Sequence, residues 1–447
     1  MTTSVEAPNR VGPQAHPVRV LLEQRDFRRL LSIRLAGQFA DGLFQAALVS
    51  AVFFDPNRAT TATQAAVGFA TLLLPFSLVG PFAGVFLDRW RRQRVLLYSN
   101  LLRAGLLVVL APLLAAFGPT SAAVIALTLV IISLNRFVLS GLSAGLPHVV
   151  PGRRLVTANS FTTTLGGGAV ALGGALAAGL RGLVGRGDTG ASRSALLAAA
   201  LYVVAALVAR VVGADRLGPT DPPAERHLTA ALRAVLGGLV SGARHVHERG
   251  PAARGLAAIA AHRFFYGLSF VATLLLYAGT GFLGRGFAHS SGGAFLALGE
   301  VVFTSVVGGL LAALVTPRVT RRVGTQTWIS VVFAVAAVVE VVFGAPYTHL
   351  AFLVAALVLG FAAQAAKICV DTLVQESVED DFRGRVFSFY DTLFNVSFVS
   401  AAAAAAFLVP SDGRSYLVIA VVAGGYALTS LLYLLASRRA APVPAES

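Results

Sequence analysis

The chain contains little charge and almost no cysteine or lysine. Its single cysteine, Cys369, can form no internal disulfide, and its single lysine, Lys367, lies within an apolar run. Only 13% of the 447 residues are charged, whereas 56% are hydrophobic and the mean hydropathy is +0.75. A soluble protein needs more polar surface than this composition supplies. These shortages exclude an ordinary soluble domain and favour a protein that lies in a lipid bilayer.

Motifs for bound nucleotides and metals are missing as well. No Gly-rich turn ends in Gly-Lys-Ser or Gly-Lys-Thr, as a phosphate-binding loop requires. His227, His245 and His247 lie in one polar segment without cysteines or carboxylates at metal-ligand spacing. We therefore predict that the protein is not an enzyme and holds no cofactor or metal.

Long apolar stretches repeat along nearly the whole chain. A helix needs about 20 mostly apolar residues to cross the hydrocarbon of a bilayer. The stretches that meet this length are 31–54, 65–87, 95–117, 120–143, 160–183, 194–212, 255–282, 293–316, 326–345, 350–373, 388–409 and 415–436. The sequence thus predicts an all-α membrane protein with twelve transmembrane helices.

Arginines cluster in the connectors on one side of the predicted spans. They are Arg89, Arg91, Arg92, Arg94, Arg153, Arg154, Arg318, Arg321, Arg322, Arg383 and Arg385. Cytoplasmic loops carry such a basic excess, so this side, which also holds both termini, is predicted to face the cytoplasm. The connector with Arg181, Arg186 and Arg193 is the exception on the other side. The same rule accounts for the net charge of +15, and we expect no nucleic-acid partner.

The predicted spans fall into two groups of six separated by a polar segment. This segment, residues 213–254, contains three prolines and then apolar residues at helical spacing from Leu228 to Val246. We interpret it as a cytoplasmic linker with an amphipathic helix, and we favour a passive tether on the lipid headgroups over a regulatory docking site. The predicted parts are a cytoplasmic tail (1–30), a six-helix bundle (31–212), the linker (213–254), a second six-helix bundle (255–437) and a cytoplasmic tail (438–447).

The two groups of spans carry traces of a duplication. When one half is slid along the other by about 229 residues, corresponding glycines and arginines meet. Gly80, Arg89, Arg92 and Arg154 then align with Gly309, Arg318, Arg321 and Arg383. We therefore expect the two six-helix bundles to be pseudo-symmetric.

The connector after the second span reads Gly84-Val85-Phe86-Leu87-Asp88-Arg89-Trp90-Arg91-Arg92. Together with twelve spans and a long central loop, it resembles the major facilitator superfamily, whose motif here is a glycine, an aspartate four residues later and several basic residues. The match departs at Arg91, where the family often has glycine. The resemblance implies the major facilitator fold and a cytoplasmic gate, in which Asp88 approaches the start of span eleven. The predicted gate residues are Gly84, Asp88, Arg89, Arg92, Arg383 and Arg385.

Two further stretches suggest a branch of this superfamily. The segment 375–388 and the motifs Asn135-Arg136-Phe137 and Leu146-Pro147 look like bacterial macrolide-efflux and enterobactin-exporter-like permeases. Span five contains the glycines of 166–168 and 173–174, which we expect to permit close packing across the two halves. Drug/proton antiporters of the superfamily usually carry Gly-Pro where this chain has Ala-Val at 169–170.

Ionisable residues inside apolar spans are costly and therefore indicate function. Gln38, Asp41 and Gln45 share one face of span one, and Arg103 and Arg136 lie at a depth similar to that of Asp41. A carboxylate beside guanidinium groups stays ionised. We predict that these five residues line a central cavity, with Arg136 equally suited to a structural brace.

Span ten and two further carboxylates complete the predicted cavity. Gln364, Lys367 and Asp371 share a face of span ten, and the last two are spaced to pair directly. This pair is either a permanent structural contact or a switch that exchanges partners during transport. Glu300 has no partner nearby in the sequence, which suits a proton carrier, whereas we expect Glu340 to reach the outer interface of the membrane.

From these residues we predict a secondary active transporter of the bacterial plasma membrane that works as a monomer. It would export a hydrophobic or amphipathic small molecule in exchange for protons, by alternating access of two rocking bundles. A lipid or lysolipid translocase of the same fold, and a non-transporting membrane scaffold or sensor, remain as alternatives.

Overall fold

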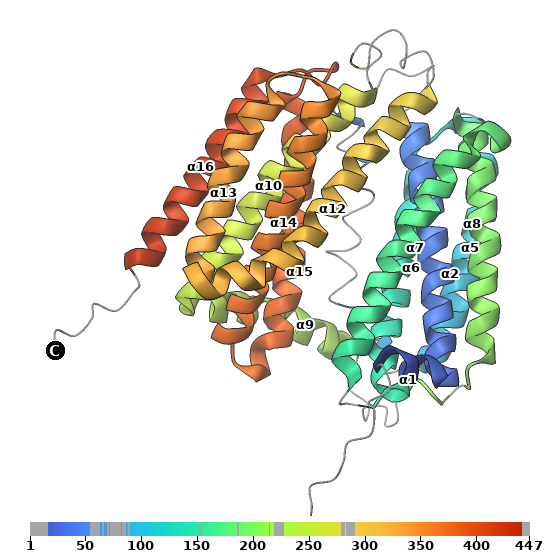
Figure 1. Cartoon of the computed structure of the whole chain (residues 1–447). Coiled ribbons are helices and arrows are strands. Elements are labelled where there is room, and N and C mark those ends of the chain that lie inside the picture. Colours follow the sequence, from blue (N-terminus) through green and yellow to red (C-terminus); the bar gives the residue numbers. More distant parts are fainter. Residues whose placement is uncertain are drawn as a thin grey trace, which may run out of the picture.

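The computed structural model consists of helices that form two bundles side by side (Figure 1). It describes residues 17–53, 63–64, 67–68, 71, 82, 86–87, 90–151, 154–185, 187–213, 215–218, 228–278, 282 and 291–439. The N-terminal bundle contains α2 (Arg25–Phe53), α5 (Arg92–Phe117), α6 (Ala122–Val149), α7 (Leu155–Val184) and α8 (Gly187–Val211). The C-terminal bundle contains α10 (Gly250–Ala278), α12 (Ser291–Val323), α13 (Thr325–Gly344), α14 (His349–Ser377), α15 (Asp380–Leu408) and α16 (Tyr416–Arg439).

Eleven helices among the described residues are long and apolar enough to cross a membrane. Each corresponds to one of the predicted spans. The remaining predicted span, 65–87, lies almost wholly outside the described residues. The expectation of an all-α membrane protein is confirmed.

Corresponding helices of the two bundles begin in the same way. The Oγ of Ser121 accepts a hydrogen bond from the backbone N–H of Val124 at the start of α6. The Oγ1 of Thr348 likewise accepts a hydrogen bond from the backbone N–H of Ala351 at the start of α14. Such caps satisfy backbone donors that have no partner within the helix. These two helices are the fourth predicted span of each half, so the shared cap agrees with a duplicated architecture.

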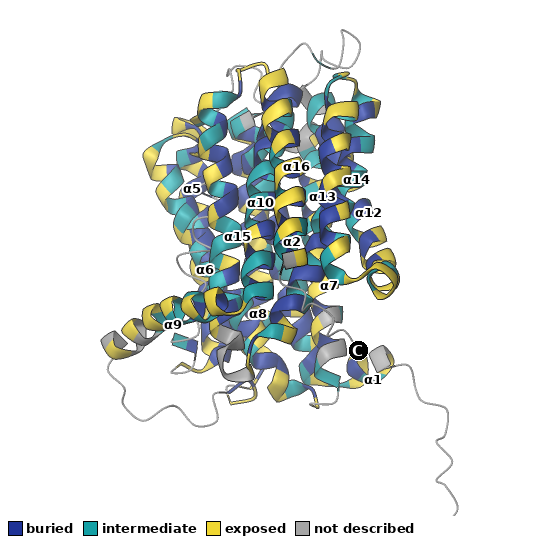
Figure 2. Cartoon of the chain, turned by 90° about the vertical axis from the view of Figure 1, so that its left-hand side faces the viewer, coloured by how far each residue is buried: buried dark blue, intermediate teal, exposed yellow. Residues whose placement is uncertain are grey.

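Two further helices lie at one end of the molecule, which we call the linker end. They are α1 (Pro17–Glu23) and α9 (Leu228–Glu248), and both views place them there (Figures 1 and 2). Helix α2 begins at Arg25 and α10 at Gly250, inside the segments predicted as a tail and a linker. Hydropathy marks only the apolar part of a helix, whereas backbone hydrogen bonding continues through its polar ends.

Helix α9 packs against protein. An added Cβ at Gly242 would lie 3.0 Å from the backbone of Arg385 in α15, and Val246 is buried with the C-terminal core. Arg249, just after α9, forms an ion pair with Glu379 before α15. The interpretation of this segment as a tether on headgroups did not anticipate these contacts.

Each bundle has its own hydrophobic core. Among the described residues, one cluster of buried residues lies in the C-terminal bundle, and three others lie in the N-terminal half. The bundles meet where α7 contacts α12 and α2 contacts α10. Val49 and Val52, far from the linker end of α2, pack against the C-terminal core. The contacts of these two valines therefore join the halves at the end opposite the linker.

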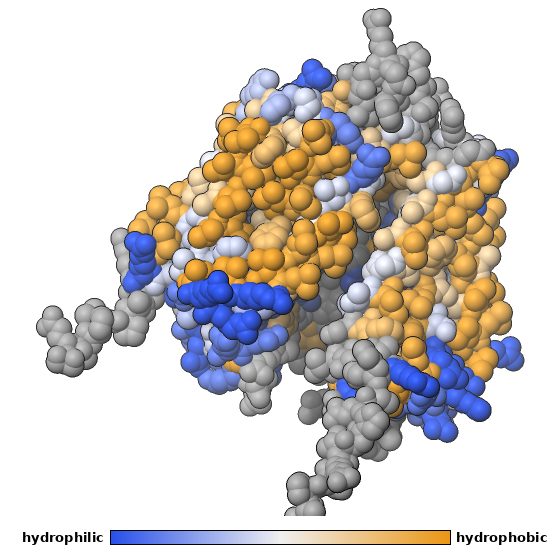
Figure 3. Space-filling view, in the orientation of Figure 1, coloured by the Kyte–Doolittle hydropathy of each residue, from blue (hydrophilic) through white to orange (hydrophobic). Residues whose placement is uncertain are grey.

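The outer surface is apolar between polar ends. Figure 3 shows a broad hydrophobic belt over both bundles and hydrophilic residues gathered at the linker end. Many large apolar side chains on this surface are exposed, including Phe303, Leu350 and Phe407. Figure 2 shows exposed residues along the outer helix faces and buried residues inside. This distribution is the one that a protein surrounded by lipid requires.

Candidate functional site

Asp41 lies inside the N-terminal bundle, where α2, α5 and α8 meet. It forms an ion pair with Arg103 of α5 and accepts a hydrogen bond of 2.6 Å from the hydroxyl of Tyr202 in α8. The guanidinium carbon of Arg103 lies 3.8 Å from the centre of the Tyr202 ring. Arg103 and Tyr202 are fully buried and Asp41 is 4% exposed. This network braces three helices of one half, and it pairs the two buried charges with each other.

The other predicted residues of span one have different neighbours. Gln38 accepts a hydrogen bond of 3.0 Å from Arg34, and its side chain lies against Gly166 of α7. Gln45 is partly exposed. The structure thus places Asp41 and Arg103 together, while Gln38 faces α7 of the same half.

Arg136 of α6 lies within electrostatic range of charges from both halves. It interacts electrostatically with Asp41 in its own bundle and with Asp391 of α15 in the other bundle. Asp391 in turn interacts with Lys367 and Asp371 of α14. We call Arg136, Lys367, Asp371 and Asp391 the central charge cluster.

Within the central charge cluster, Lys367 and Asp371 form the predicted pair. The Nζ of Lys367 donates to the carboxylate of Asp371 at 2.7 Å, and the two side chains are 41% and 30% exposed. The Nζ also lies 5.3 Å from the centre of the Tyr390 ring. Gln364, one turn earlier, lies against Gly309 of α12. Partial exposure allows this pair to open without leaving a charge in a sealed interior.

The roles of two charged residues of this region were not predicted from the sequence. Asp391 was not singled out, although it is an ionisable residue within a predicted span and the same rule would have found it. The orientation of Arg263 could not be chosen from sequence. Its guanidinium carbon lies 3.9 Å from the ring centre of Phe394 and 4.7 Å from that of Phe398, so it faces α15.

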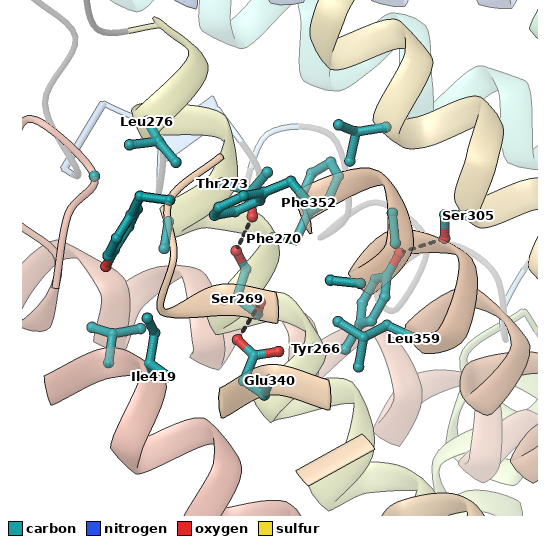
Figure 4. Close-up of a pocket in the computed structure, with 18 of the residues that line it drawn as sticks. Tyr266, Ser269, Phe270, Thr273, Leu276, Ser305, Glu340, Phe352, Leu359 and Ile419 are labelled. Atoms are coloured by element: carbon teal, nitrogen blue, oxygen red, sulfur yellow. Dashed lines mark hydrogen bonds between the residues drawn. The ribbon is translucent and has the colours of Figure 1, made fainter. Parts of the chain in front are cut away.

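Glu300 and Glu340 have partners that are distant in the sequence. Glu300 lies 3.0 Å from the Nε2 of His349, whose Nδ1 lies 2.7 Å from the hydroxyl of Tyr277. Glu340 accepts a hydrogen bond of 2.8 Å from Ser269 and is 5% exposed. The expectation that Glu340 reaches the membrane interface is wrong, because its side chain points into the C-terminal bundle and lines a cavity there (Figure 4).

The predicted gate is described only in part. Gly84, Asp88 and Arg89, and the side chain of Arg383, lie outside the described residues. Arg92 donates to the backbone oxygens of Ala144 and Leu217 at 3.0 and 3.2 Å. Arg385 packs beside α9. The described contacts of Arg92 therefore hold together the linker end of the N-terminal half.

The glycines of α7 pack within one half. An added Cβ at Gly173 would lie 2.1 Å from the backbone oxygen of Phe39, and one at Gly166 would lie 1.8 Å from the side chain of Gln38. Gly42 of α2 approaches the backbone of Val170 as closely. The expectation that these glycines serve packing across the halves is thus corrected for Gly166 and Gly173, which pack on α2 of their own bundle.

Among the described residues, no group of three His, Cys, Asp or Glu side chains could hold a metal ion. The chemistry that the described site offers is that of ion pairs, hydrogen bonds and apolar surfaces. An arrangement of this kind can bind and move solutes or protons.

Comparison with known proteins identifies the family of this two-bundle helical membrane protein. Residues 34–399 match the family model of the Major Facilitator Superfamily. An uncharacterized MFS-type transporter of Mycobacterium tuberculosis is 37% identical over 418 residues, which cover 94% of this chain and 92% of the relative. A protein of Mycobacterium bovis with the same description matches equally. The chain belongs to the major facilitator superfamily and is a multi-pass membrane transporter of that type.

Solved structures share the fold at low sequence identity. The crystal structure of a peptide transporter, POT, matches with a TM-score of 0.69 at 13% identity, over 96% of this chain and 99% of the other. The nucleoside transporter NupG matches with a TM-score of 0.67 at 13% identity, over 91% and 98%. These similarities confirm the major facilitator fold.

Proposed function

We propose that the protein is a secondary active transporter of a bacterial plasma membrane that exports a hydrophobic or amphipathic small molecule in exchange for protons. The observation that carries this proposal is the central charge cluster, because it combines charges of α6 from one half with charges of α14 and α15 from the other. Coupling requires groups whose electrostatic partners change when the halves move.

Arg136 is placed to make such a change. It interacts with Asp41 of its own half and with Asp391 of the opposite half. When the bundles move apart at this level, Asp391 loses Arg136 and keeps Lys367 of its own half, which Asp371 also engages. The negative charge of Asp391 is then less well compensated, which is costly within a membrane protein. Taking up a proton removes that cost, so bundle movement and proton binding become linked.

The direction and the type of substrate rest on other features. The resemblance of residues 375–388 to macrolide-efflux and enterobactin-exporter-like permeases favours export. The mostly apolar interior of the C-terminal bundle favours a hydrophobic or amphipathic solute over a sugar, which needs many hydrogen-bonding side chains.

The test is flux in proteoliposomes with an imposed pH gradient, followed with the hydrophobic dye Hoechst 33342 and an internal pH indicator. We expect gradient-dependent dye movement in the wild type and a loss of about tenfold or more in Asp391→Asn, corresponding to about 1.4 kcal/mol or more in the rate-limiting barrier. Glu248→Gln, which changes an exposed carboxylate of α9, is the matched control and should retain the wild-type rate.

Other outcomes would assign a different function. Flipping of headgroup-labelled lipid without a gradient would indicate a lipid translocase. Absence of any flux, together with capture of a partner through residues 213–254, would indicate a scaffold or sensor. Asp41 is less suitable as a test residue, because its ion pair with Arg103 braces the N-terminal bundle.

A further inference from the structure

A cavity inside the C-terminal bundle lies apart from the central charge cluster. It is lined by residues of α10, α12, α13, α14 and α16 and of the connectors at the end opposite the linker. The volume of the cavity is about 170 Å³. Its walls are mainly apolar, with Leu276, Leu359 and Ile419 among the lining residues (Figure 4). No residue of the central charge cluster is among the described residues that line it.

Glu340 is the one charged side chain among the described lining residues. It is 5% exposed, and one of its carboxylate oxygens accepts the hydrogen bond from Ser269. In Figure 4 the other oxygen lies on the side of Tyr266, away from Ser269. A buried carboxylate with a single neutral partner is costly unless it takes up a proton, or unless a cation or further donors complete its surroundings.

The basic residues of α10 that are nearest to Ser269 in the sequence contact other side chains. Arg263 stacks on Phe394 and Phe398 of α15. His262 lies with its Nδ1 3.1 Å from the hydroxyl of Tyr426 and stacks on Phe333. No lysine, arginine or histidine is among the described residues lining the cavity. A cation for Glu340 would therefore come from a ligand.

The aromatic lining specifies what kind of cation fits. Tyr266, Phe270, Tyr347 and Phe352 line the same cavity as Glu340. Aromatic rings attract organic ammonium groups through their faces and bury the apolar part of the same ligand. A hydrated inorganic cation would find few oxygen ligands here, and an anion would be repelled by the carboxylate.

We propose that this cavity is a binding site for a lipophilic organic amine, with the ammonium group against Glu340 and the apolar body among the aromatic side chains. The site is independent of the proton coupling proposed above, because it shares no described residue with the central charge cluster.

The test is a binding comparison between 4-phenylbutylamine and its uncharged counterpart 4-phenylbutan-1-ol, on purified protein in nanodiscs. Binding is measured by equilibrium dialysis and by ligand-induced thermal stabilisation. We expect the amine to bind at least about tenfold more tightly than the alcohol, which is about 1.4 kcal/mol. Glu340→Gln should abolish this preference, whereas Glu376→Gln, a change at an exposed carboxylate of α14, should leave it unchanged.

A second variant keeps the carboxylate and fills the space. Ala355 of α14 lines the cavity, so Ala355→Leu should weaken binding of the amine while Glu340 is intact. Equal binding of amine and alcohol would overturn the proposal and indicate an apolar pocket for a lipid chain. Unchanged amine binding in a folded Glu340→Gln or Ala355→Leu variant would also overturn it. Amine binding without proton-driven flux would support the site and count only against the coupling.

Discussion

At the scale of single residues, each bundle buries a tyrosine of its last helix against a polar residue of its first. Tyr202 of α8 bonds to Asp41 of α2, and the hydroxyl of Tyr426 in α16 lies 3.1 Å from His262 of α10. Both tyrosines are fully buried. The partners differ between the halves, yet the helices joined are equivalent, so the two halves share the position of this contact but not its chemistry.

The ion pair of the N-terminal brace should be essential for stability. Arg103→Met leaves Asp41 buried without its counter-ion and should reduce the free energy of unfolding by about 3–5 kcal/mol. Tyr202→Phe removes one hydrogen bond to a charged group and should cost about 1–3 kcal/mol. The measurement is thermal or denaturant unfolding in detergent.

Arg94→Met is the control for these variants, since Arg94 is an exposed arginine of the same helix. It should unfold like the wild type. If Arg103→Met were as stable as Arg94→Met, the network around Asp41 would not act as a brace.

The sequence predicted part of this network. Asp41 and Arg103 were expected to be neighbours, because ionisable residues at equal depth in two spans have few other ways to be satisfied. Tyr202 could not be predicted, since a tyrosine in an apolar span fits a core, an interface or a lipid-facing position equally well. The side of α2 on which Asp41 lies depends on helix packing, which hydropathy does not encode.

At the scale of helices, the contact of α2 with α7 depends on missing side chains. The backbone oxygen of Phe39 occupies the space that a Cβ at Gly173 would need. In the same helix, a Cβ at Gly167 would meet nothing within 4 Å. Close packing of α7 on α2 therefore requires a glycine at position 173, whereas position 167 has room for a side chain.

These two positions give a matched pair of variants. Gly173→Ala should force α2 and α7 apart and lower the free energy of unfolding by about 1–3 kcal/mol. Gly167→Ala should be neutral or stabilising by up to about 1 kcal/mol, because alanine favours a helix over glycine. Comparison of their melting temperatures tests the packing, and equal effects would contradict it.

The existence and order of the eleven long apolar helices among the described residues followed from the lengths of apolar runs. The helices against which each of them packs could not be predicted in this way. The sequence placed the glycines of span five between the halves, because small residues indicate a close contact without naming the neighbour. The contact between Gly173 and Phe39 depends on the order in which the helices are arranged around the bundle. Such an arrangement is a property of all its helices together.

At the scale of the whole molecule, the linker end and the opposite polar end should face opposite sides of the membrane. The basic connectors predict that the linker end faces the cytoplasm. His247 of α9 is exposed at that end, and Ser411 is exposed in the connector between α15 and α16 at the opposite end. Cys369 is 1% exposed, so it should give little background in thiol labelling.

Cysteine labelling in intact cells tests this orientation. Ser411→Cys should react with a membrane-impermeant maleimide added outside, because its connector is expected to face outward. His247→Cys should react only after the cells are permeabilised, and the wild type should react weakly under both conditions. The reverse pattern would show that the orientation inferred from arginine placement is wrong.

The connection between the bundles also limits how far they can separate. The turn at 215–218 is held to the N-terminal half by Arg92, and α9 is seated on α15 of the C-terminal half. Residues 219–227 join these two fixed points, and an extended chain spans at most about 3.3–3.6 Å per residue. The ten steps from Gly218 to Leu228 therefore span at most roughly 33–36 Å, so chain length alone limits how far the halves can separate at this end.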